Sequence, residues 1–475
     1  MFMEPECSIA EPTEAGRLNV YVGSQIPYED RSQIAEVLGW DESQVRIIGQ
    51  NMGGGFGGKE DIAGQIHASL LAQATGRPVK LLYDRRESML VHPKRHATQI
   101  QAVETELYGD TGAYASLGEI VMARATTHSA GPYEVPHVKA DCYAMYTNNP
   151  PAGAFRGFGV TQSMFAIESM IDRLAEALKI DPGKLREMNA LRPGSMTNTG
   201  QILDNSVGLL ECLTKLGDEV RKIDPEPFKP KPDLDHPHLV RSWGLAAAYK
   251  NTGLGDGIPD VSHAELELFE NGRFEVRSSA AEMGQGLVAV MQMIVSEELS
   301  ADPEDVDVLV MDTDLTPNGG PTTASRQTYV TGNAARHAAI ALREAITAFL
   351  AEKYDHNPSA IHFQNGQVLL GEKYDIHPDK VEFKNGLVLV NGKAVKYDEI
   401  AEEMIKVGQV PRALYRYEAP ETQPLGTGGD MHFAYSFAAQ AAQVEVNTDT
   451  GEVRVLRVIA ATDVGAVINP LGLKG

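Results

Sequence analysis

The spacing of apolar side chains predicts a long helix in the first half of the chain. Between residues 162 and 179 they recur at steps of three and four residues, which places them on one face of a helix. The pattern ends before Asp181 and Pro182, which suit the N-cap and the first position of a following helix. We expect the apolar stripe to pack in the core. Its positions are Met164, Ile167, Ile171, Leu174 and Leu178.

The second half shows alternating patterns that predict antiparallel hairpins. Residues 264–269 and 274–278 alternate apolar and polar side chains on either side of Asn271-Gly272, a strong turn signal. A second turn signal, at residues 447–451, separates two further alternating stretches near the end of the chain. Helix and strand signals together predict a mixed α/β (α+β) fold.

A proline-rich stretch divides the chain. Residues 224–238 contain five prolines, so this stretch can form neither a helix nor a central strand. A chain of 475 residues is also long enough for more than one domain. We therefore expect two large mixed domains, residues 1–230 and 231–475.

Composition excludes several classes of function. Lysine and arginine total 42 against 65 acidic residues, a net charge of −23 that repels nucleic acid and anionic lipid. No apolar run approaches the roughly 20 residues that span a bilayer, and the acidic start does not resemble a secretory signal. The cysteines, Cys7, Cys142 and Cys212, lie too far apart for a disulfide framework. We expect a soluble, cytoplasmic protein with no nucleic-acid or membrane partner.

A glycine-rich segment, residues 53–60, is the first candidate for chemistry. It matches the phosphate-loop pattern G-x-x-x-x-G-K, but Glu60 follows where that motif needs Ser or Thr to hold magnesium. A carboxylate there would repel a triphosphate, which argues against a nucleoside triphosphatase. What remains is a ribbon of backbone, interrupted by Phe56, that can lay amide groups against a large anionic or oxo ligand.

Three further segments combine exposed backbone with a few functional side chains. Residues 150–159 place Arg156 between two phenylalanines, an arrangement suited to a flat electron-poor ring or a phosphate. Residues 282–286 present an amide side chain at an expected helix start, and residues 317–325 are rich in hydroxyl and turn residues. Taken singly, residues 150–159 are better explained by core packing, and the other two segments by ordinary turns.

Together and in this order, the motifs resemble the molybdenum-binding subunit of the xanthine dehydrogenase/aldehyde oxidoreductase family of molybdenum hydroxylases. The resemblance runs from residue 2 to residue 470 and rests on MEPE, GGGFGGK, DTGAY, AFRGFG, EMGQG, PTTAS and VGAVINP. It implies the cofactor-binding fold of that family, with molybdopterin held between the two domains. The cofactor could be the mononucleotide or the cytosine dinucleotide form, and no protein side chain is expected to bind the metal.

The resemblance also assigns cofactor contacts to four loops. The loop whose amides face the oxo group of the metal is formed by Gly55, Phe56 and Gly57. A second loop reaching the metal is formed by Ala154, Phe155 and Arg156. The loops that hold the pterin and its phosphate contain Gly284, Gln285, Gly286, Thr323, Ala324 and Ser325.

Substrate class is suggested by three side chains. Glu60 and Arg124 sit where purine-oxidising members carry a glutamate and an arginine, and Phe158 would stack on the substrate ring. A carboxylate can share a ring proton, and a guanidinium can stabilise charge growing on a carbonyl oxygen. The resemblance thus implies hydroxylation of a xanthine- or hypoxanthine-like purine with water as the oxygen source. Nicotinate, another N-heteroaromatic compound or an aldehyde remains an alternative substrate. Two alternatives stay open: Glu60 and Arg124 only pair with each other or with neighbours, or the chain is a non-catalytic homologue that acts as a scaffold.

The resemblance also implies partner chains. In that family the general base is a glutamate beyond the VGAVINP segment, but the given sequence ends at Gly475, shortly after this segment. The pterin-contacting glutamine that the family carries before MEPE is also absent. We expect a second molybdopterin chain, or a further part of the same subunit, to supply the glutamate, and this chain alone to be inactive. Three scattered cysteines cannot provide the four ligands of an iron–sulfur cluster. We therefore expect 2Fe-2S and FAD on separate iron–sulfur and flavin subunits.

Overall fold

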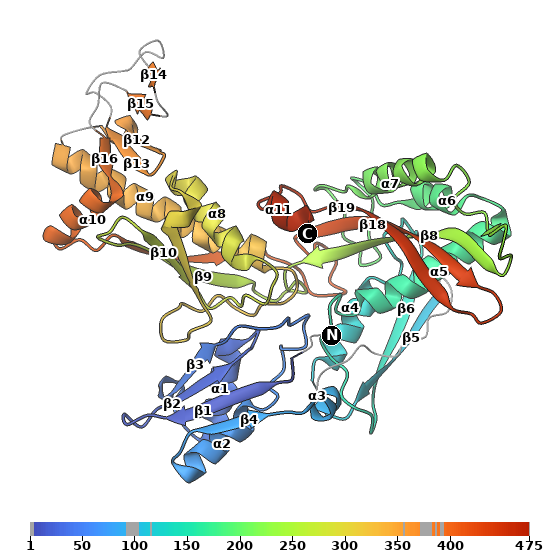
Figure 1. The fold of residues 1–475 in the computed structure, drawn as a ribbon, viewed down its shortest axis with the longest axis horizontal. Coiled ribbons are helices and arrows are strands. Elements are labelled where there is room, and N and C mark those ends of the chain that lie inside the picture. Colours follow the sequence, from blue (N-terminus) through green and yellow to red (C-terminus); the bar gives the residue numbers. More distant parts are fainter. Residues whose placement is uncertain are drawn as a thin grey trace.

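The computed structural model describes residues 4–91, 104–114, 116–354, 357–370, 382–384, 387–389 and 394–474. Within them the chain forms three units, each built on a four-stranded sheet (Figure 1). We name these units after one strand each: the β1 unit, the β8 unit and the β9 unit. Helices and strands contribute to all three, which confirms the predicted mixed α/β class.

The β1 unit has the sheet order β3-β2-β1-β4, with β2 and β3 parallel and the other neighbours antiparallel. Two helices pack on the sheet, and one core joins Val20 and Ile47 of the strands to Ile34 and Ala68 of the helices, all fully buried. The elements are β1 (Cys7–Pro12), β2 (Leu18–Val22), α1 (Pro27–Leu38), β3 (Val45–Gly49), α2 (Gln65–Thr75), β4 (Val79–Leu82) and, after β4, α3 (Arg85–Val91).

The β8 unit has the sheet order β19-β18-β8-β7, next to a parallel pair, β5 and β6. Its core joins Leu213, which precedes the proline-rich stretch, to Trp243 and Phe437, which follow it. This core thus contains residues from both sides of the predicted division near residue 230, and that division stays a prediction. The elements are β5 (Glu104–Gly112), α4 (Gly118–Thr127), β6 (Lys139–Tyr146), α5 (Val160–Leu178), α6 (Pro182–Asn189), α7 (Leu209–Ile223), β7 (Lys231–Pro232), β8 (Leu239–Thr252), β18 (Ala434–Asn447), β19 (Val453–Asp463) and α11 (Pro470–Lys474).

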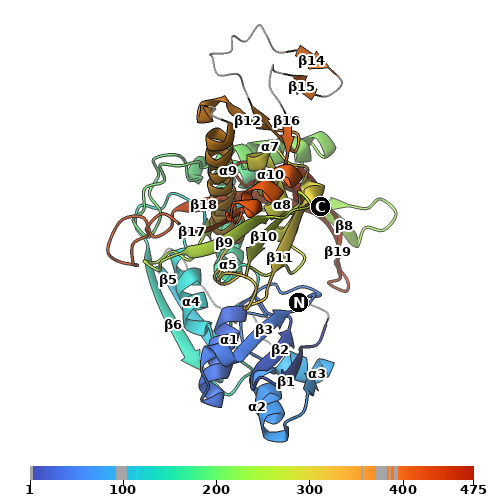
Figure 2. The same ribbon diagram turned by 90° about the vertical axis from the view of Figure 1, so that its left-hand side faces the viewer.

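The β9 unit has the sheet order β11-β10-β9-β17, and α8 and α9 pack together beside it. Its main elements are β9 (Val261–Leu268), β10 (Phe274–Ser278), α8 (Leu287–Leu299), β11 (Val306–Val310), α9 (Gly332–Tyr354), α10 (Tyr397–Lys406) and β17 (Arg412–Glu418). Small strands project from it, at the end of the molecule opposite the β1 unit (Figure 2). They are β12 (Ile361–Gln364), β13 (Gln367–Leu370), β14 (Glu382–Lys384), β15 (Leu387–Leu389) and β16 (Ala394–Lys396). None of the helices in the described residues is long and apolar enough to cross a membrane.

The local signals of the sequence are confirmed. Asp181 caps α6 by accepting a hydrogen bond from the N–H of Lys184 at 2.9 Å. β9 and β10 pair antiparallel through a turn in which Gly272 has φ +79°, and β18 and β19 pair through a turn that contains Gly451. Each signal depends on a few neighbouring residues, which is why the sequence alone reveals it.

The long predicted helix, α5, is present, but its apolar stripe is only partly buried. Met164 is 7% exposed, whereas Leu174 and Leu178 are 46% and 53% exposed, so the core prediction was wrong for these two leucines. The helix instead buries a face that contains Glu168. Its carboxylate accepts hydrogen bonds from Arg186 Nε and from a backbone amide of β8, both at 2.8 Å. These bonds tie α5 to α6 and β8, while the last leucines of the helix lie on its exposed side.

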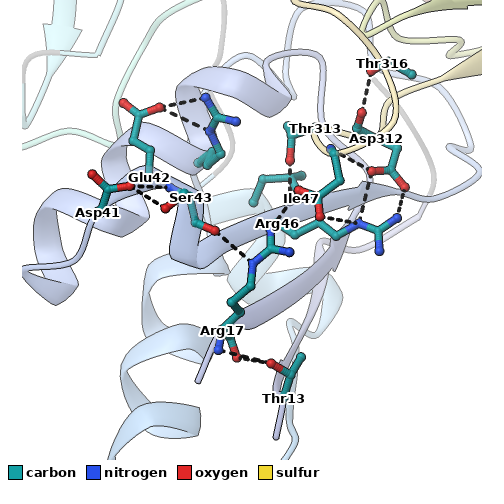
Figure 3. A network of polar contacts seen from close by, with 12 residues as sticks. Thr13, Arg17, Asp41, Glu42, Ser43, Arg46, Ile47, Asp312, Thr313 and Thr316 are labelled. Carbon is teal, nitrogen blue, oxygen red and sulfur yellow. Dashed lines mark hydrogen bonds and ion pairs between the residues drawn. The ribbon is translucent and has the colours of Figure 1, made fainter. Parts of the chain in front are cut away.

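Polar contacts hold the β1 unit against the loop that follows β11 (Figure 3). Arg46 of β3 donates from Nε and Nη2 to the two carboxylate oxygens of Asp312, at 3.1 and 2.6 Å. The N–H of Ile47 donates to Thr313 Oγ1 at 3.0 Å, and the N–H of Thr313 donates to the Ile47 carbonyl at 3.2 Å. The loop held in this way leads into the segment that lines the cavity described next.

Candidate functional site

A cavity of about 490 Å³ lies where the three units meet. The β1 unit contributes the loop after β3, the β8 unit the loop before α5 and the end of β8, and the β9 unit the loops before α8 and α9. All four predicted loops reach this cavity. The predicted site residues in its wall are Gly55, Phe56, Gly57, Glu60, Phe155, Arg156, Phe158, Gly284, Gln285, Thr323, Ala324 and Ser325.

Three predicted site residues are not part of this wall. Ala154 is fully buried, and Gly286 is the N-cap of α8. Arg124, on α4, is 8% exposed; its Nη2 donates to a backbone carbonyl at 2.8 Å and its Nη1 contacts the ring of His432. Burial lowers the pKa of Arg124 from its ordinary value. Arg124 and Glu60 are not ion-pair partners in the described part of the chain.

The first two predicted loops touch through their backbones. Gly57 has φ +86°, and a Cβ there would lie 3.3 Å from backbone atoms of Ala154 and Phe155. The N–H of Arg156 donates to the carbonyl of Phe56 at 2.7 Å, and the Arg156 guanidinium lies 5.9 Å from the centre of the Phe56 ring. Position 57 therefore requires glycine, because the left-handed backbone and the close approach both disfavour a side chain.

Lys59, which completes the G-x-x-x-x-G-K pattern, forms an ion pair with Glu4 and is 6% exposed. Burial lowers its pKa to about 8. It borders a separate cavity of about 380 Å³ next to β1, not the one lined by the four loops. This placement agrees with the sequence argument against a nucleoside-triphosphate loop, in which the lysine would face the phosphates.

Gln25 is a cavity residue that no sequence motif indicated. It is 1% exposed and lies between β2 and α1. Its Oε1 accepts from the N–H of Gly57 at 3.1 Å, and its Nε2 donates to Glu60 Oε1 at 3.2 Å and to the Thr322 carbonyl at 2.7 Å. Gln25 thus joins two of the predicted loops. A polar residue after a strand with a parallel neighbour is a signal that could have identified it, because ligands bind outside the carboxyl ends of such strands.

Glu60 provides the one carboxyl group among the described residues of the cavity wall. Burial raises its pKa to about 8, and the charge of Asp61 adds to the shift. Hydrogen bonds to Thr323 and Gln25, and the charge of Lys250, oppose it. At neutral pH the carboxyl group is mainly protonated, so it can both donate to and accept from a ring nitrogen or a carbonyl oxygen.

Backbone N–H groups at the start of α8 are hydrogen-bonded to a side chain of the preceding loop. The carboxylate of Glu282 accepts from the N–H groups of Gly284, Gly286 and Val288 at 2.8, 3.1 and 3.0 Å. Gln285 Nε2 donates to a backbone carbonyl of the same loop at 2.8 Å. An anionic ligand at this helix start would therefore have to displace Glu282.

The loop before α9 is held by Arg326, which is fully buried. Its Nε donates to Asp260 at 2.6 Å, and its other nitrogens donate to three backbone carbonyls at 2.7, 2.8 and 3.0 Å. Ala324 and Ser325 follow one another with φ +49° and +55°, a conformation that costs energy in residues other than glycine. The buried arginine thus maintains a strained turn that presents Thr323 to the cavity.

The donors in the cavity wall suit an anionic, flat group. They include loop backbone, the hydroxyls of Thr323 and Ser325, and the Arg156 guanidinium, all of which can bind phosphate and oxo groups. A Cβ at Gly284 would meet no atom within 4 Å, so this part of the wall leaves open space. No three His, Cys, Asp or Glu side chains of the described residues group together as a metal site. The wall therefore fits a cofactor that brings its own metal ligands.

All four loops fall within two matches to one family of domains. The molybdopterin cofactor-binding domain pattern matches residues 1–190, and a second pattern of the same description matches residues 219–475. The chain belongs to the molybdopterin cofactor-binding domain family. The resemblance to molybdenum-binding subunits of the xanthine dehydrogenase family, which the motifs predicted, is confirmed.

Two relatives illustrate the range of this family. A probable xanthine dehydrogenase subunit of Bacillus subtilis (strain 168) is 33% identical over 493 residues, covering 100% of this chain and 61% of the relative. The nicotinate dehydrogenase large molybdopterin subunit of Eubacterium barkeri is 47% identical over 227 residues, covering 45% of this chain and 53% of that subunit. The chain thus spans less than two thirds of the length of these relatives.

Solved structures share the fold. Quinoline 2-oxidoreductase from Pseudomonas putida 86 superposes with a TM-score of 0.83 and 22% identity, over 100% of this chain and 61% of that one. An aldehyde oxidoreductase from Desulfovibrio gigas gives a TM-score of 0.81 and 25% identity, over 99% of this chain and 48% of that one. The predicted molybdenum-hydroxylase fold is confirmed.

Proposed function

We propose that this chain is the cofactor-binding subunit of an oxidoreductase that hydroxylates an N-heterocycle with water as the oxygen source. The observation that carries the proposal is one cavity in which four cofactor-type loops surround Glu60 and Phe158. When bound, molybdopterin supplies the redox chemistry. The chain's own residues hold the cofactor, orient the substrate ring and exchange a hydrogen bond or a proton with it.

The cofactor contacts proposed for this chain follow the four loops. The residues proposed for the metal end are Gly55, Phe56, Gly57, Ala154, Phe155 and Arg156, of which Ala154 is buried outside the cavity wall. The residues proposed for the pterin and its phosphate, in the mononucleotide or the cytosine dinucleotide form, are Gly284, Gln285, Gly286, Thr323, Ala324 and Ser325. Gln25 adds a positioning role, because it bonds both Gly57 and Glu60.

The substrate contacts proposed from the sequence are those of a xanthine- or hypoxanthine-like purine. Phe158 would stack on the ring, and Glu60 would meet a ring nitrogen as a protonated carboxyl. Arg124 would stabilise charge on a carbonyl oxygen, which requires it to leave its contact with His432. An N-heteroaromatic acid is the second candidate, favoured by Lys250 in the cavity wall.

The partners proposed are an iron–sulfur subunit, a flavin subunit and a second molybdopterin chain that carries the catalytic glutamate, in a cytoplasmic complex. Several relatives are named as subunits, including a 6-hydroxypseudooxynicotine dehydrogenase complex subunit gamma, which supports a multisubunit assembly. Cys7, Cys142 and Cys212 are separate free thiols. They cannot provide the four ligands of an iron–sulfur cluster.

The first test is metal analysis and native mass spectrometry of the complex purified through this chain. We expect molybdenum, pterin, iron, flavin and additional chains, and no hydroxylation by the isolated chain. In the complex, Glu60→Gln should retain molybdenum and lower turnover of an N-heterocycle about a hundredfold or more, whereas Glu36→Gln on the surface of α1 should not change it. A complex without molybdenum would contradict the proposal and favour a non-catalytic scaffold.

A further inference from the structure

β19 forms a free edge of the β8 sheet in the described part of the chain. The sheet order β19-β18-β8-β7 gives it one neighbour, β18, with which it pairs antiparallel. An edge strand leaves the N–H and C=O groups of its outer side without strand partners. At 11 residues, β19 is longer than most strands and offers a long edge to another chain.

The side chains along this edge are apolar and exposed. Val455 and Val458 are 63% and 58% exposed, and the exposed apolar side chains continue into α11, where Leu471 is 79% exposed. Besides two arginines and a terminal aspartate, the residues of β19 are uncharged, and none is a proline. Charges, prolines or a covering chain are the means by which proteins protect edge strands. We therefore expect a covering chain here.

The face of the sheet that points away from its helices is exposed as well. The helices α5, α6 and α7 pack on the face that contains Tyr249 and Phe437. On the other face Ala246 of β8 lies opposite Gln440 of β18, which lies opposite Ala460 of β19, and all three are exposed. We call this face, together with the free edge, the β19 surface. Its main residues are Ala246, Ala438, Gln440, Val455, Val458 and Ala460.

The β19 surface is continuous with the four-loop cavity. Lys250 lies on the same face of β8 as Ala246 and Ala248, because side chains alternate along a strand. Lys250 is also part of the cavity wall. The segment that follows β19 lies near the middle of the molecule, where the units approach one another (Figure 1). A chain bound to the β19 surface would therefore lie close to the cavity to which the proposed partner must bring its glutamate.

Solved and curated relatives show that the fold includes more chain than residues 1–475. All of this chain superposes on quinoline 2-oxidoreductase, yet it covers 61% of that chain. The nicotinate dehydrogenase large molybdopterin subunit, by contrast, is shorter than this chain, because 227 aligned residues make up 53% of it. A member of the family can thus be a subunit of such a length, and a separate chain can supply the further part of the fold.

We propose that the β19 surface is the docking site of the second molybdopterin chain, and that this chain adds a strand to the free edge of β19. The inference rests on the proposed function, which supplies the partner. Strand addition would pair the outer N–H and C=O groups of β19, while apolar side chains of the partner cover Val455 and Val458. A second copy of this chain fits less well, because each copy carries a net charge of −23.

Hydrogen–deuterium exchange of the intact complex, purified through this chain, tests the strand addition. In a free edge strand about half of the amides lack a strand partner, so residues 453–463 would exchange much faster than residues 434–447 of β18, which lie between two strands. We expect the two strands to exchange equally slowly in the complex. Fast exchange of residues 453–463 while the second chain is present would overturn the inference.

Substitutions on the surface test the contact itself. Val455→Glu and Val458→Glu would bury an unpaired charge, and we expect each to lower the amount of second chain in the purified complex at least about tenfold. Val407→Glu and Val410→Glu are the matched controls, because these valines of the β9 unit are also 63% and 58% exposed. Melting curves show whether each variant folds. Unchanged amounts of second chain in both β19 variants would contradict the docking site.

Cross-linking and intact-mass measurements on the same complex identify what covers β19. Cross-links from Lys222 on α7 or Lys474 on α11, both exposed, should reach a second chain of the molybdopterin cofactor-binding family. Cross-links to another copy of this chain, or a subunit mass that shows the cover to be a continuation of this chain, would overturn the inference. Molybdenum is measured separately. Its absence would refute the proposed function, whereas a molybdenum-containing complex with a rapidly exchanging β19 would refute this inference alone.

Discussion

Glu60 and Lys250 line the same cavity, and burial shifts their pKa values in opposite senses, to about 8 and about 7. An acid with a raised pKa and a base with a lowered pKa are both held near their neutral forms. Each can therefore gain or lose a proton close to neutral pH, the range in which proton transfer to a substrate is most effective. Shifted pKa values of this kind are common among the titratable groups of active sites.

Asp30, in the first turn of α1, shows the same effect of burial on stability. It is fully buried, and burial raises its pKa to about 7 from an ordinary value of 3.8, with Ser24 and Gln65 opposing the shift. Between these values the unfolded chain has lost the proton while the folded chain still holds it. Stability therefore falls as the pH rises through this range, by about 1.4 kcal/mol per unit.

Asp30→Asn should remove this pH dependence. We expect the unfolding midpoint of the variant, minus that of the unaltered protein, to be larger at about pH 8 than at about pH 5. Circular dichroism melting curves at both pH values measure the difference. Glu36→Gln, on the exposed side of the same helix, should leave the difference unchanged. An Asp30→Asn effect of equal size at both pH values would contradict the assignment.

At the scale of elements, glycines allow the loops to approach one another and the neighbouring helices. Gly159, the N-cap of α5, has φ +91°, and a Cβ there would lie 2.1 Å from the carbonyl oxygen of Val121 on α4. The contact is with backbone, which cannot move aside without displacing α4. Phe158, one residue earlier, also has a positive φ, of +47°. The packing of two helices thus determines where Phe158 enters the cavity.

Gly159→Ala should disrupt this arrangement. We expect a loss of stability well above the roughly 1 kcal/mol of a left-handed alanine, together with a lower molybdenum content. The matched control is Gly76→Ala at the end of α2, where φ is +63° and a Cβ would meet no atom within 4 Å. Unfolding midpoints and molybdenum analysis distinguish them. Equal effects of the two substitutions would show that the contact with α4 is unimportant.

At the scale of the whole molecule, the cavity exists because three units meet. Gln25 of the β1 unit accepts a hydrogen bond from the N–H of Gly57. It also donates to the carbonyl of Thr322 in the β9 unit, which is 297 residues away in the sequence. Arg46 and Asp312 hold the same two units together nearby. The four loops can form one wall only while this junction is closed.

Arg46→Met should loosen the junction without unfolding the β1 unit. The pair with Asp312 is partly buried, so its loss should cost about 1–3 kcal/mol and increase hydrogen exchange in the loop of residues 312–316. Arg31→Met is the control, because the Arg31–Glu42 pair lies within the β1 unit. Hydrogen–deuterium exchange by mass spectrometry measures the effect. Unchanged exchange in residues 312–316 would refute a role for Arg46 in closing the cavity.

The sequence motifs predicted most of the cavity wall but not all of its chemistry. The glycine loops were recognisable because each contains its own conformational requirement, such as the left-handed backbone at Gly57. Arg124 was predicted to contact substrate, yet in the structure it contacts His432 instead of lining the cavity. Lys250 and Gln25 carry no motif, so their positions became visible only when distant strands were brought together.

The residue pattern was sufficient for what depends on neighbours along the chain: the cap at Asp181, the turn at Gly272 and the glycine loops that identify the cofactor family. Folding in three dimensions was needed for what depends on burial. It selected the buried face of α5 around Glu168 and placed Lys250, rather than Arg124, in the cavity wall. The reason is physical: turns and caps arise from local geometry, whereas burial and charge environment arise from contacts between segments far apart in sequence.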